Sequence, residues 1–321
     1  MKFITRISAL LLLAAVASLA AAQTWPGQSV RIIVPFTPGT GMDTIARAVA
    51  PRLSERLGQP VVVANVPGAS GNIGADQVAK SNPDGYTVLM GANTMLMASQ
   101  LYKNVPFDPV RDFAPVSMAA WGTLMLVANP KTGIKSLADL MAQARAKPVS
   151  ISYGSPGVGT PHHMAMELFK VQTSLFMLHV PYRGSAGYTT DLLSGEVNVG
   201  FLPVHVAQGF VNSGRLNALA VGSPKRHPVA PNVATFEELG AKGVDVDLWY
   251  AFFVPSKTPS AAQQRLNTEI SAILKLPEVR DALGKAGMVA EASTPAELGD
   301  IVRKDYPRWG AVIQRNNISA E

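Results

Sequence analysis

The residues that could do chemistry gather in glycine-rich segments, each directly after a predicted strand and directly before a predicted helix. These segments cover residues 36–43, 68–72 and 91–94 in the first half of the chain and 154–160 and 184–187 in the second. Helix N-termini present unpaired N–H groups and the positive end of the helix dipole, and glycine lets a ligand approach the backbone closely. If the two sets face each other, they form a cleft that suits a carboxylate; the alternative is that they are only turns.

Two of these segments are similar to parts of enzyme motifs, but neither motif is complete. In a dinucleotide fingerprint that begins with Gly39-Thr40-Gly41, the third glycine would stand at Thr44, and Asn65 occupies the place of the acidic residue. In a nucleophile elbow around Ser155, Tyr153 stands where the first glycine belongs. We therefore expect Ser155 to act as a hydrogen-bond donor and not as a nucleophile.

Two neighbouring histidines, His162 and His163, open a predicted helix over residues 161–171. His163 and Glu167 have a spacing that can hold a metal, but no third ligand is evident and the zinc-protease pattern is absent. We expect these two side chains to pack or cap the helix, and we expect His162 to face the cleft. Arg183 can pair with a carboxylate or form an exposed salt bridge. The sequence predicts no metal and no cofactor.

Strands and helices alternate along both halves of the chain. Short apolar, β-branched runs predict the strands, and apolar residues at helical spacing predict the helices. The predicted strands cover residues 30–34, 61–64, 86–90, 149–153, 197–201 and 218–221, and the predicted C-terminal helices cover 261–274, 277–286 and 295–315. This alternation is typical of an α/β fold with parallel sheets, in which ligands bind beyond the carboxyl ends of the strands.

Two long apolar stretches, 114–128 and 246–254, are predicted to cross between two lobes. They divide the chain into a signal peptide (1–22), a first part of lobe 1 (23–122), lobe 2 (123–247) and a second part of lobe 1 (248–321). Two adjacent crossings can act as a hinge, so the sequence predicts two lobes that close around a ligand.

The N-terminal segment has the layout of a secretion signal. Lys2 and Arg6 precede an apolar run over residues 7–16, and small residues at 20–22 follow. The run is short for a membrane span, which needs about 20 apolar residues. We expect removal of residues 1–22 and a periplasmic location, the alternative being a retained N-terminal anchor.

The composition narrows the class further. The chain has no cysteine, which excludes disulfides, thiol catalysis and thiolate metal sites. The formal net charge is +6, but the lysines and arginines are scattered without a basic run. Nucleic-acid binding usually needs a clustered basic patch, so we expect no nucleic-acid partner.

A series of short segments carries a family resemblance from about Trp25 to the C-terminus. They are residues 33–39 with Asp43, 46 and 47; 65–74; 83–87; 101–103 with 107–109; 153–155 with Gly157, Gly159, Thr160, His163 and 167–169; and 180–184 with 191–193. In this order and spacing, the chain resembles the extracytoplasmic solute-binding receptors of the tripartite tricarboxylate transporter family, often called Bug receptors.

The resemblance implies a type II periplasmic-binding-protein fold, or Venus flytrap, with two parallel-sheet lobes, a two-strand hinge and no catalysis. It implies a monomer that captures a di- or tricarboxylate or an aromatic acid and delivers it to membrane transporter subunits. By position, it points to these ligand-binding residues: Phe36, Gly39, Gly41, Ser70, Thr94, Ser155, Thr160 and Ser185.

Three departures from the family pattern bear on the ligand. Gly39-Thr40-Gly41 replaces two adjacent glycines, Tyr188 stands in place of the alanine of a usual Pro-Ala pair, and Leu202 replaces a frequent aspartate. A buried ammonium needs a paired charge, so the missing aspartate leads us to expect a ligand that is not an amino acid. Leu202 and Tyr188 favour an acid with an apolar or aromatic body, and Leu202 joins the predicted binding residues.

Two other classes of protein stay open on sequence grounds. One is a sensor that binds its ligand for signalling, which the sequence does not separate from a transport receptor. The other is a hydrolase or dehydrogenase on an α/β scaffold, for which the sequence shows no nucleophile–base pair, fingerprint or metal ligands. A ligand that is recovered unchanged after incubation would separate the receptor from the enzyme.

Overall fold

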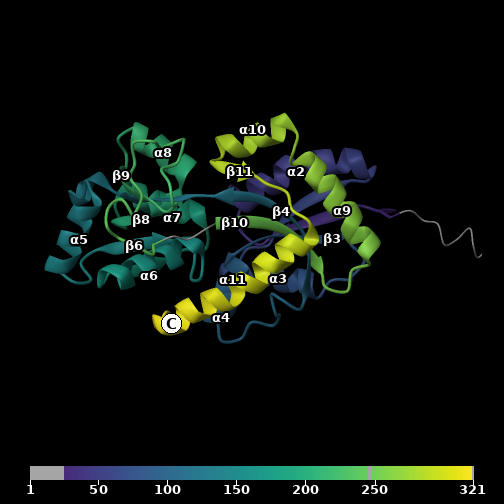
Figure 1. Cartoon of the computed structure of the whole chain (residues 1–321), viewed down its shortest axis with the longest axis horizontal. Coiled ribbons are helices and arrows are strands. Elements are labelled where there is room, and N and C mark those ends of the chain that lie inside the picture. Colours follow the sequence, from purple (N-terminus) through teal and green to yellow (C-terminus); the bar gives the residue numbers. More distant parts are fainter. Residues whose placement is uncertain (1–24, 245–247, 320–321) are drawn as a thin grey trace, which may run out of the picture.

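The computed structural model describes residues 25–244 and 248–319, and it consists of two lobes placed end to end (Figure 1). Each lobe is a β-sheet with helices on both faces, which buries the apolar side of every element. The predicted signal peptide, residues 1–22, lies outside the described residues. Among the helices that are described, none combines the length and apolar character that a membrane span needs.

Lobe 1 contains a mixed six-stranded sheet with the order β11-β4-β10-β3-β1-β2. Its strands are β1 (Val30–Val34), β2 (Val61–Asn65), β3 (Thr87–Ala92), β4 (Phe113–Gly122), β10 (Leu248–Pro255) and β11 (Met288–Ala290). Strands β2, β1 and β3 are parallel, as the sequence predicts for strands that alternate with helices. Strands β10, β4 and β11 pair antiparallel, so the parallel prediction holds for only half of this sheet.

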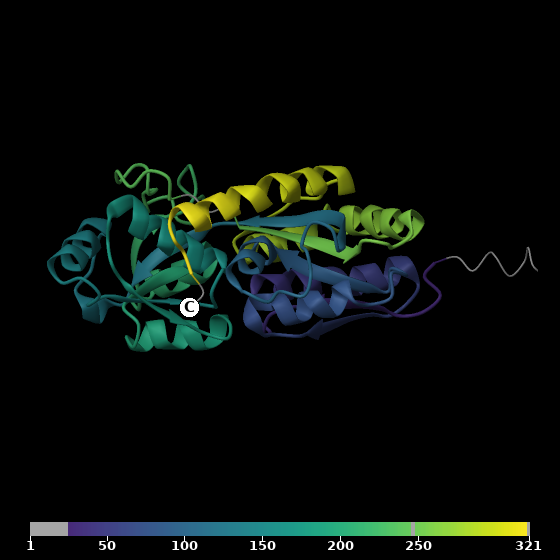
Figure 2. The same cartoon turned by 90° about the horizontal axis from the view of Figure 1, so that it is seen from below.

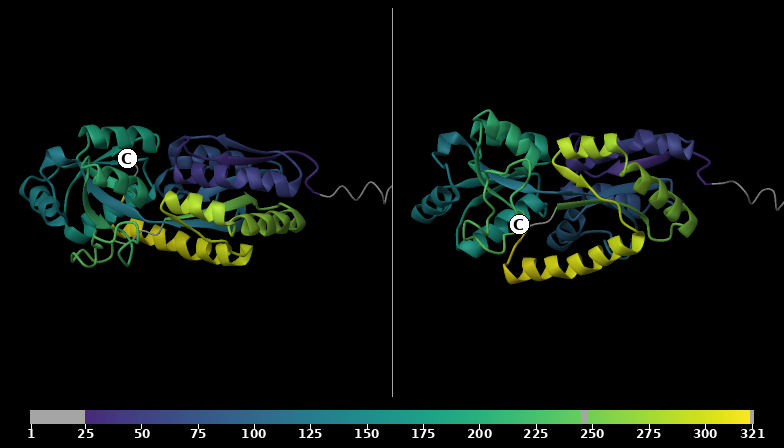
Figure 3. Two further views of the ribbon diagram at one scale, coloured as in Figure 1. Left: turned by 90° about the horizontal axis from the view of Figure 1, so that it is seen from above. Right: turned by 45° about the horizontal axis from the view of Figure 1, so that its top comes forward.

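Helices cover both faces of the lobe 1 sheet. One face carries α2 (Gly41–Leu57), α9 (Ser260–Ile273) and α10 (Pro277–Lys285), and the other carries α3 (Asn72–Ala79), α4 (Thr94–Leu101) and α11 (Pro295–Arg315). Ile45, Val49, Leu53 and Leu57 stand four residues apart, a spacing that predicts one apolar helix face. The structure confirms this face of α2, because all four side chains are buried. Full burial of each such side chain stabilises the fold by about 1.5–3 kcal/mol. Helix α11 runs along lobe 1 toward lobe 2 (Figures 2 and 3).

Lobe 2 contains a five-stranded sheet with the order β7-β6-β8-β5-β9. Its strands are β5 (Leu124–Ala128), β6 (Ser152–Ser155), β7 (Leu178–Pro181), β8 (Val199–Pro203) and β9 (Asn217–Val221). Helices α5 (Leu137–Ala146) and α6 (Pro161–Thr173) pack on one face, and α7 (Ser185–Ser194) and α8 (Val204–Asn212) pack on the other. Strands β7, β6 and β8 are parallel, and β5 runs antiparallel between β8 and β9.

The two crossings between the lobes lie side by side. The first leads from β4 through Thr123 into β5, and the second reaches lobe 1 at Leu248, which pairs with Gly122. Adjacent extended segments can bend together, which is the arrangement of a hinge. The predicted boundary between residues 247 and 248 stays a prediction, because residues 245–247 lie outside the described residues.

Several predicted strands have different limits from those expected, including 197–201, which is observed as Val199–Pro203. Residues 149–153 were expected to form one strand, but Val149 has a φ of 57° and is 63% exposed, so β6 begins only at Ser152. Strand β6 then continues through Gly154, which pairs with Gly200. In lobe 1, β3 extends through Ala92 because Gly91 and Ala92 pair with the crossing strand β10. Pairing with distant strands decides these limits, and local composition does not contain that information.

Candidate functional site

A small cavity lies between the lobes, at the carboxyl ends of the parallel strands. We call it the inner cavity; it has a volume of about 40 Å³. Lobe 1 contributes Phe36, Thr40, Gly41, Met42, Ala92, Thr94, Leu248 and Tyr250, and lobe 2 contributes Pro156, Thr160, Pro161, His162, Ser185 and Pro203. A water molecule needs about 10–15 Å³ of such space. The inner cavity therefore has room for a few atoms, as in a carboxylate group.

A larger cavity, which we call the outer cavity, adjoins the inner one and has a volume of about 310 Å³. Five residues line both: Thr40, Gly41, His162, Ser185 and Pro203. The outer cavity is lined in addition by Pro38, Gly39, Thr44, Ala186, Tyr188, Thr189, Thr190, Leu202, His205, Val206, Ala286 and Met288. Together they form one site with a narrow end and a wide end. The volume of this site is usual for a small-molecule pocket.

Five helices direct their N-termini at these cavities. The first turns of α2, α4, α6 and α7 line the inner cavity, and the start of α8 lines the outer one. In α2 and α6, a threonine side chain caps the helix, whereas α4, α7 and α8 carry no side-chain cap hydrogen bond. N–H groups in an uncapped first turn are donors without an intrahelical partner. Together with the helix dipoles, they make the cavity attractive to an anion.

Three hydroxyl groups add to these donors. Thr94, Ser185 and Tyr250 line the inner cavity, and their hydroxyls make no hydrogen bond with any residue in the described ranges. Burial raises the pKa of the Tyr250 hydroxyl, so it stays protonated and can donate. An added Cβ on Gly41 would lie 2.5 Å from the Tyr250 hydroxyl oxygen. Glycine is therefore needed at this position to leave room for the tyrosine.

His162 is a further unpaired group in the site. Its side chain is 9% exposed, and its buried Nδ1 atom has no hydrogen-bond partner among the described residues. Burial lowers the pKa of His162 to about 4, so the ring is neutral near pH 7. A neutral imidazole donates from one nitrogen and accepts at the other. His162 can therefore contact a ligand without bringing a positive charge.

Neither cavity is lined by a lysine, arginine, aspartate or glutamate among the described residues. A ligand carboxylate is thus met by backbone N–H groups, hydroxyls and helix dipoles. An ammonium group finds no carboxylate there, and burying an unpaired charge is strongly unfavourable. The cavity wall is suited to an anion without an amino group.

The loop after β1 is held in place by Asp43. Its carboxylate accepts hydrogen bonds from the Gly39 N–H (3.0 Å), the Asn65 amide (2.9 Å) and the Arg47 guanidinium (3.0 Å). Burial by itself would raise the pKa of Asp43, but the bonds from Arg47, Gly39 and Asn65 outweigh it and lower the pKa. Asn65, which stands in the place of a ribose-binding acid, thus fixes this loop.

The structure places nine of the ten predicted binding residues in the walls of three pockets. Phe36, Gly41, Thr94, Thr160, His162 and Ser185 line the inner cavity, Gly39 and Leu202 line the outer cavity, and Ser70 lines a third pocket. Ser155 lines none of these pockets. Eight of the predicted residues therefore line the two adjoining cavities, and their contact with a ligand stays a prediction.

The third pocket shares Phe36 and Pro156 with the inner cavity and has a volume of about 740 Å³. Arg183 lines it and is exposed, so this cation stands outside the inner cavity. Ser70 has a φ of 52° and lies between Ala69 and Gly71, which also have positive φ, and its hydroxyl lies 3.1 Å from the Tyr102 hydroxyl. Such a left-handed conformation is held only by its surroundings.

Ser155 forms a pair that the sequence did not reveal. Its Oγ lies 2.7 Å from Nε2 of His179, so the statement that the chain lacks a nucleophile–base pair is wrong. Ser155 is, however, fully buried, and its hydroxyl also bonds the backbone of Gly157. Burial, reinforced by the charge of Lys170 and by His163, lowers the pKa of His179 to about 3, which makes it a poor base. The pair therefore fixes the loop after β6.

His163 and Glu167 belong to an interior network of lobe 2. The rings of Tyr153, His179 and His163 stack with centroid separations of 4.6 and 4.3 Å. His163 Nδ1 accepts the Gly159 N–H at 3.1 Å, and Glu167 accepts from the Tyr153 hydroxyl. Burial, reinforced by the charge of Lys170, lowers the pKa of His163 to about 3. These contacts join the first turns of α6 to β6, β7 and the loop after β6. His163 and Glu167 therefore have a structural role.

Tyr188 and Leu202, the departures from the family pattern, form an apolar wall of the outer cavity. Tyr188 is fully buried and its hydroxyl donates to the Phe201 carbonyl at 2.7 Å. Its ring fills the space next to Gly154 and Gly200, where an added Cβ would lie 2.5 and 2.2 Å from ring or hydroxyl atoms. Leu202 is 1% exposed. Both side chains therefore support the wall of the outer cavity from behind and expose almost none of their own surface to it.

Several lining residues were missed from the sequence. Leu248 and Tyr250 come from the crossing strand β10, and Pro203 and His205 come from the β8–α8 junction. The β8–α8 junction has the same strand-to-helix order as the glycine segments, and this order could have identified it. No local signal distinguishes Tyr250 from a core residue.

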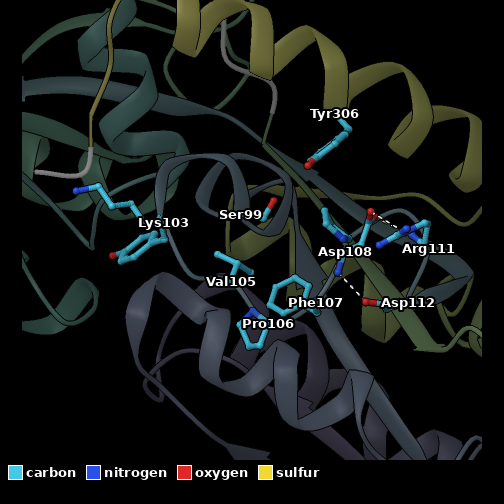
Figure 4. A pocket seen from close by; sticks show the side chains of 11 residues that line it. Ser99, Lys103, Val105, Pro106, Phe107, Asp108, Arg111, Asp112 and Tyr306 are labelled. Atoms are coloured by element: carbon cyan, nitrogen blue, oxygen red, sulfur yellow. Dashed lines mark hydrogen bonds and ion pairs between the residues drawn. The ribbon is translucent and has the colours of Figure 1, made fainter.

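Another hollow lies on lobe 1, between the loop after α4 and the side chain of Tyr306 in α11 (Figure 4). The acidic side chains that line this hollow accept hydrogen bonds from backbone N–H groups of the same loop. Asp108 accepts the N–H groups of Val110 (2.8 Å) and Arg111 (3.0 Å), and Asp112 accepts the N–H of Asp108 (2.7 Å). These carboxylates stabilise the turn. Among the described residues, no group of three or more potential ligands can hold a metal ion.

Comparison with known proteins gives matches over nearly the whole chain. A family model described as "Tripartite tricarboxylate transporter family receptor" matches residues 45–318. Protein BugT of Bordetella pertussis (strain Tohama I) is 34% identical over 303 residues, covering 94% of this chain and 93% of BugT. These matches confirm the resemblance that the sequence shows.

Solved structures with the same fold have been described with carboxylates. Rpa4515 of R. palustris with adipate has a TM-score of 0.87 and 33% identity, covering 92% of this chain and 99% of that chain. MatC (Rpa3494) from Rhodopseudomonas palustris with bound malate has a TM-score of 0.85 and 27% identity, covering 90% of this chain and 100% of that chain. The similarity confirms the expected two-lobed fold.

Proposed function

Because the chain belongs to the tripartite tricarboxylate transporter family of receptors, we propose that it captures a small carboxylate between its lobes in the periplasm and delivers it to membrane transporter subunits. Members of this family are solute-binding receptors and not enzymes, as the sequence predicts for this chain. The receptor class is shown by the family. The capture site, the periplasmic location and the delivery to a transporter are what we propose in addition.

The observation that supports capture is the convergence of uncapped helix N-termini and unpaired hydroxyls on the inner cavity. Donors come from α4 in lobe 1 and from α7 in lobe 2, so a carboxylate between them bridges the lobes. Preorganised N–H and hydroxyl donors bind an anion without a formal cation. The adipate and malate of the two R. palustris relatives are acids of the expected size.

The ligand-binding residues we propose fall into two groups. The carboxylate group is held by the surroundings of Gly41, Thr94, Thr160, His162, Ser185 and Tyr250, and the body of the ligand lies against Phe36, Gly39, Tyr188 and Leu202. Because the walls carry no acidic side chain, the ligand is an organic acid and not an amino acid. The receptor acts as a monomer, since each lobe supplies part of one site.

A thermal-shift screen followed by isothermal titration tests the proposal. The screen contains mono-, di- and tricarboxylates, aromatic acids, aspartate and glutamate. A ligand at one hundred times its dissociation constant should stabilise the protein by about 2.7 kcal/mol. Recovery of the ligand unchanged after incubation is expected of a receptor. If no acid shifts the melting curve, or if only amino acids bind, capture of an organic acid is refuted.

A pair of serine variants on the same helix provides the matched control. Ser185→Ala removes a hydroxyl of the inner cavity, and Ser194→Ala makes the same change at the exposed far end of α7. Loss of a hydrogen bond to a charged group weakens binding by about 1.5–3 kcal/mol. We expect that loss for Ser185→Ala only. Delivery is tested separately, by uptake of the labelled acid in cells with and without the receptor gene.

A further inference from the structure

Lobe 2 touches lobe 1 through residues 155–160, which we call the closing loop. An added Cβ on Gly159 would lie 2.8 Å from the Cα of Ala98, and an added Cβ on Gly157 would lie 2.6 Å from the Ser70 hydroxyl oxygen. Ala98 and Ser70 both belong to lobe 1. The position of the closing loop therefore decides how closely the two lobes approach each other.

His163 holds the closing loop from inside lobe 2. Its Nδ1 atom accepts the Gly159 N–H at 3.1 Å, and both residues are buried. Because Nδ1 accepts, the proton of the neutral ring is on Nε2, which lies 3.8 Å from the Glu167 carboxylate. Glu167 thus favours the tautomer of His163 that can accept from Gly159.

The ring of His163 is itself held by its neighbours. The His179 ring stacks on it with a centroid separation of 4.3 Å, and Tyr153 stacks on His179 at 4.6 Å. His179 Nε2 also lies 2.7 Å from the hydroxyl oxygen of Ser155. The stack of rings is therefore joined to the closing loop at two points, Ser155 and Gly159.

The bond between His163 and Gly159 matters most when the lobes are closed. Gly159 is buried at its contact with Ala98. Opening of the hinge separates these two residues and lets water reach the Gly159 N–H. Closure removes that water, and a buried N–H without an acceptor is unfavourable. Loss of the His163 acceptor therefore disfavours the closed form more than the open form.

We propose that His163 is a positioning residue for lobe closure. Its Nδ1 atom accepts the N–H group that closure buries, and the stack behind it keeps that acceptor in the required direction. The proposal deepens the proposed function, on which it rests, because capture between the lobes requires them to close. It assigns no ligand contact to His163.

Three variants separate this role from a general contribution to stability. His163→Phe keeps a ring in the stack and removes the acceptor, whereas His163→Asn places an amide oxygen close to the position of Nδ1. Tyr153→Phe is the matched control. It also keeps its ring, and the hydroxyl that it loses bonds Glu167 and no residue of the closing loop in the described part of the chain. His163→Phe and Tyr153→Phe should both lower the free energy of unfolding in urea.

A disulfide between the lobes measures closure without a ligand. An added Cβ on Gly184 of lobe 2 would lie 3.5 Å from the Cβ of Thr37 in lobe 1, which is within the usual range for a disulfide. The chain has no cysteine of its own. Thr37→Cys and Gly184→Cys are therefore combined with each variant and with the wild-type background. Because the disulfide forms only when the lobes meet, its rate with oxidised glutathione follows the closed fraction.

His163→Phe should form this disulfide about 5- to 150-fold more slowly than the wild-type background, as expected when a buried donor loses its acceptor. Without the two cysteines, its dissociation constants for malate, adipate and the tightest acid of the screen should rise by the same factor. His163→Asn should recover most of both losses. Tyr153→Phe should stay within twofold of the wild-type protein in both measurements.

The proposal is overturned if folded His163→Phe forms the disulfide as fast as Tyr153→Phe does. If His163→Phe does not fold, amide hydrogen exchange of Gly159 in the wild-type background decides. Its N–H should exchange more slowly once the disulfide has formed, and an unchanged rate would show that closure does not bury it. A protein that binds no acid refutes the proposed function, whereas the disulfide and exchange measurements need no acid and test His163 separately.

Discussion

Gly159 touches the opposite lobe, and a methyl group at this position is expected to hold the lobes apart. An added Cβ would lie 2.8 Å from the Cα and 3.0 Å from the backbone nitrogen of Ala98, which belongs to α4 of lobe 1. Backbone atoms inside a helix cannot rotate away as a side chain can. The overlap in Gly159→Ala is therefore relieved by opening the hinge.

The size of the effect follows from the overlap. Inserting a methyl group into a packed contact is unfavourable by about 1–3 kcal/mol, and here this applies only to the closed form. Because the apparent dissociation constant rises as the closed fraction falls, ligand binding should weaken about 5- to 150-fold. The stability of each lobe should change only by the strain of alanine at a φ of 77°, about 1 kcal/mol.

Gly214→Ala is the control for backbone strain. Gly214 also belongs to lobe 2, has a φ of 69°, and an added Cβ there has no atom within 4 Å. Both variants are titrated with an acid that binds the wild-type protein, and small-angle X-ray scattering measures compaction when the acid is added. The reasoning is wrong if the dissociation constant of Gly159→Ala lies within threefold of that of Gly214→Ala and if Gly159→Ala compacts normally when the acid is added. The lobes would then not close through this contact.

Three further outcomes are expected. Tyr188→Phe loses the hydrogen bond to the Phe201 carbonyl, which should lower the free energy of unfolding in urea by about 1 kcal/mol; an unchanged value would contradict that bond. Burial lowers the pKa of His162 to about 4 and that of His163 to about 3. As the pH falls, these histidines are therefore protonated in the unfolded chain at a higher pH than in the folded chain. The ligand-free protein should for this reason lose stability as the pH falls below about 6.5. Between pH 7 and 5 each should contribute a loss of at most about 2 kcal/mol, and equal melting temperatures at the two pH values would argue against it. Asp43→Ala leaves the donors of a cleft loop unpaired and should destabilise the protein by about 2 kcal/mol and weaken ligand binding; normal affinity by titration would show that this loop does not contribute.

The Ser155–His179 pair shows why a short distance does not make an active site. The hydroxyl and the ring nitrogen are in contact, yet Ser155 is fully buried and burial lowers the pKa of His179 to about 3. A general base works best when its pKa lies near the working pH. The pair therefore agrees with a receptor that holds its cleft loops rigidly and leaves its ligand unchanged.

The sequence by itself determined the local parts of the site. The glycine-rich segments were predicted to lie between a strand and a helix, and Gly41, Thr94, Thr160 and Ser185 from these segments do lie at helix N-termini. Periodicity along residues 45–57 also predicted the buried face of α2. These features depend on neighbours within a few residues, so composition and spacing contain them.

The tertiary structure alone decided which of these helix starts share a cavity. Ser155 was expected to face the ligand, but the extension of β6 turns its hydroxyl toward His179. Tyr250 enters the site only because β10 crosses back between β3 and β4. Ser155 and His179 are 24 positions apart, and Tyr250 and its strand partners are more than a hundred positions apart. No local pattern records contacts over such separations.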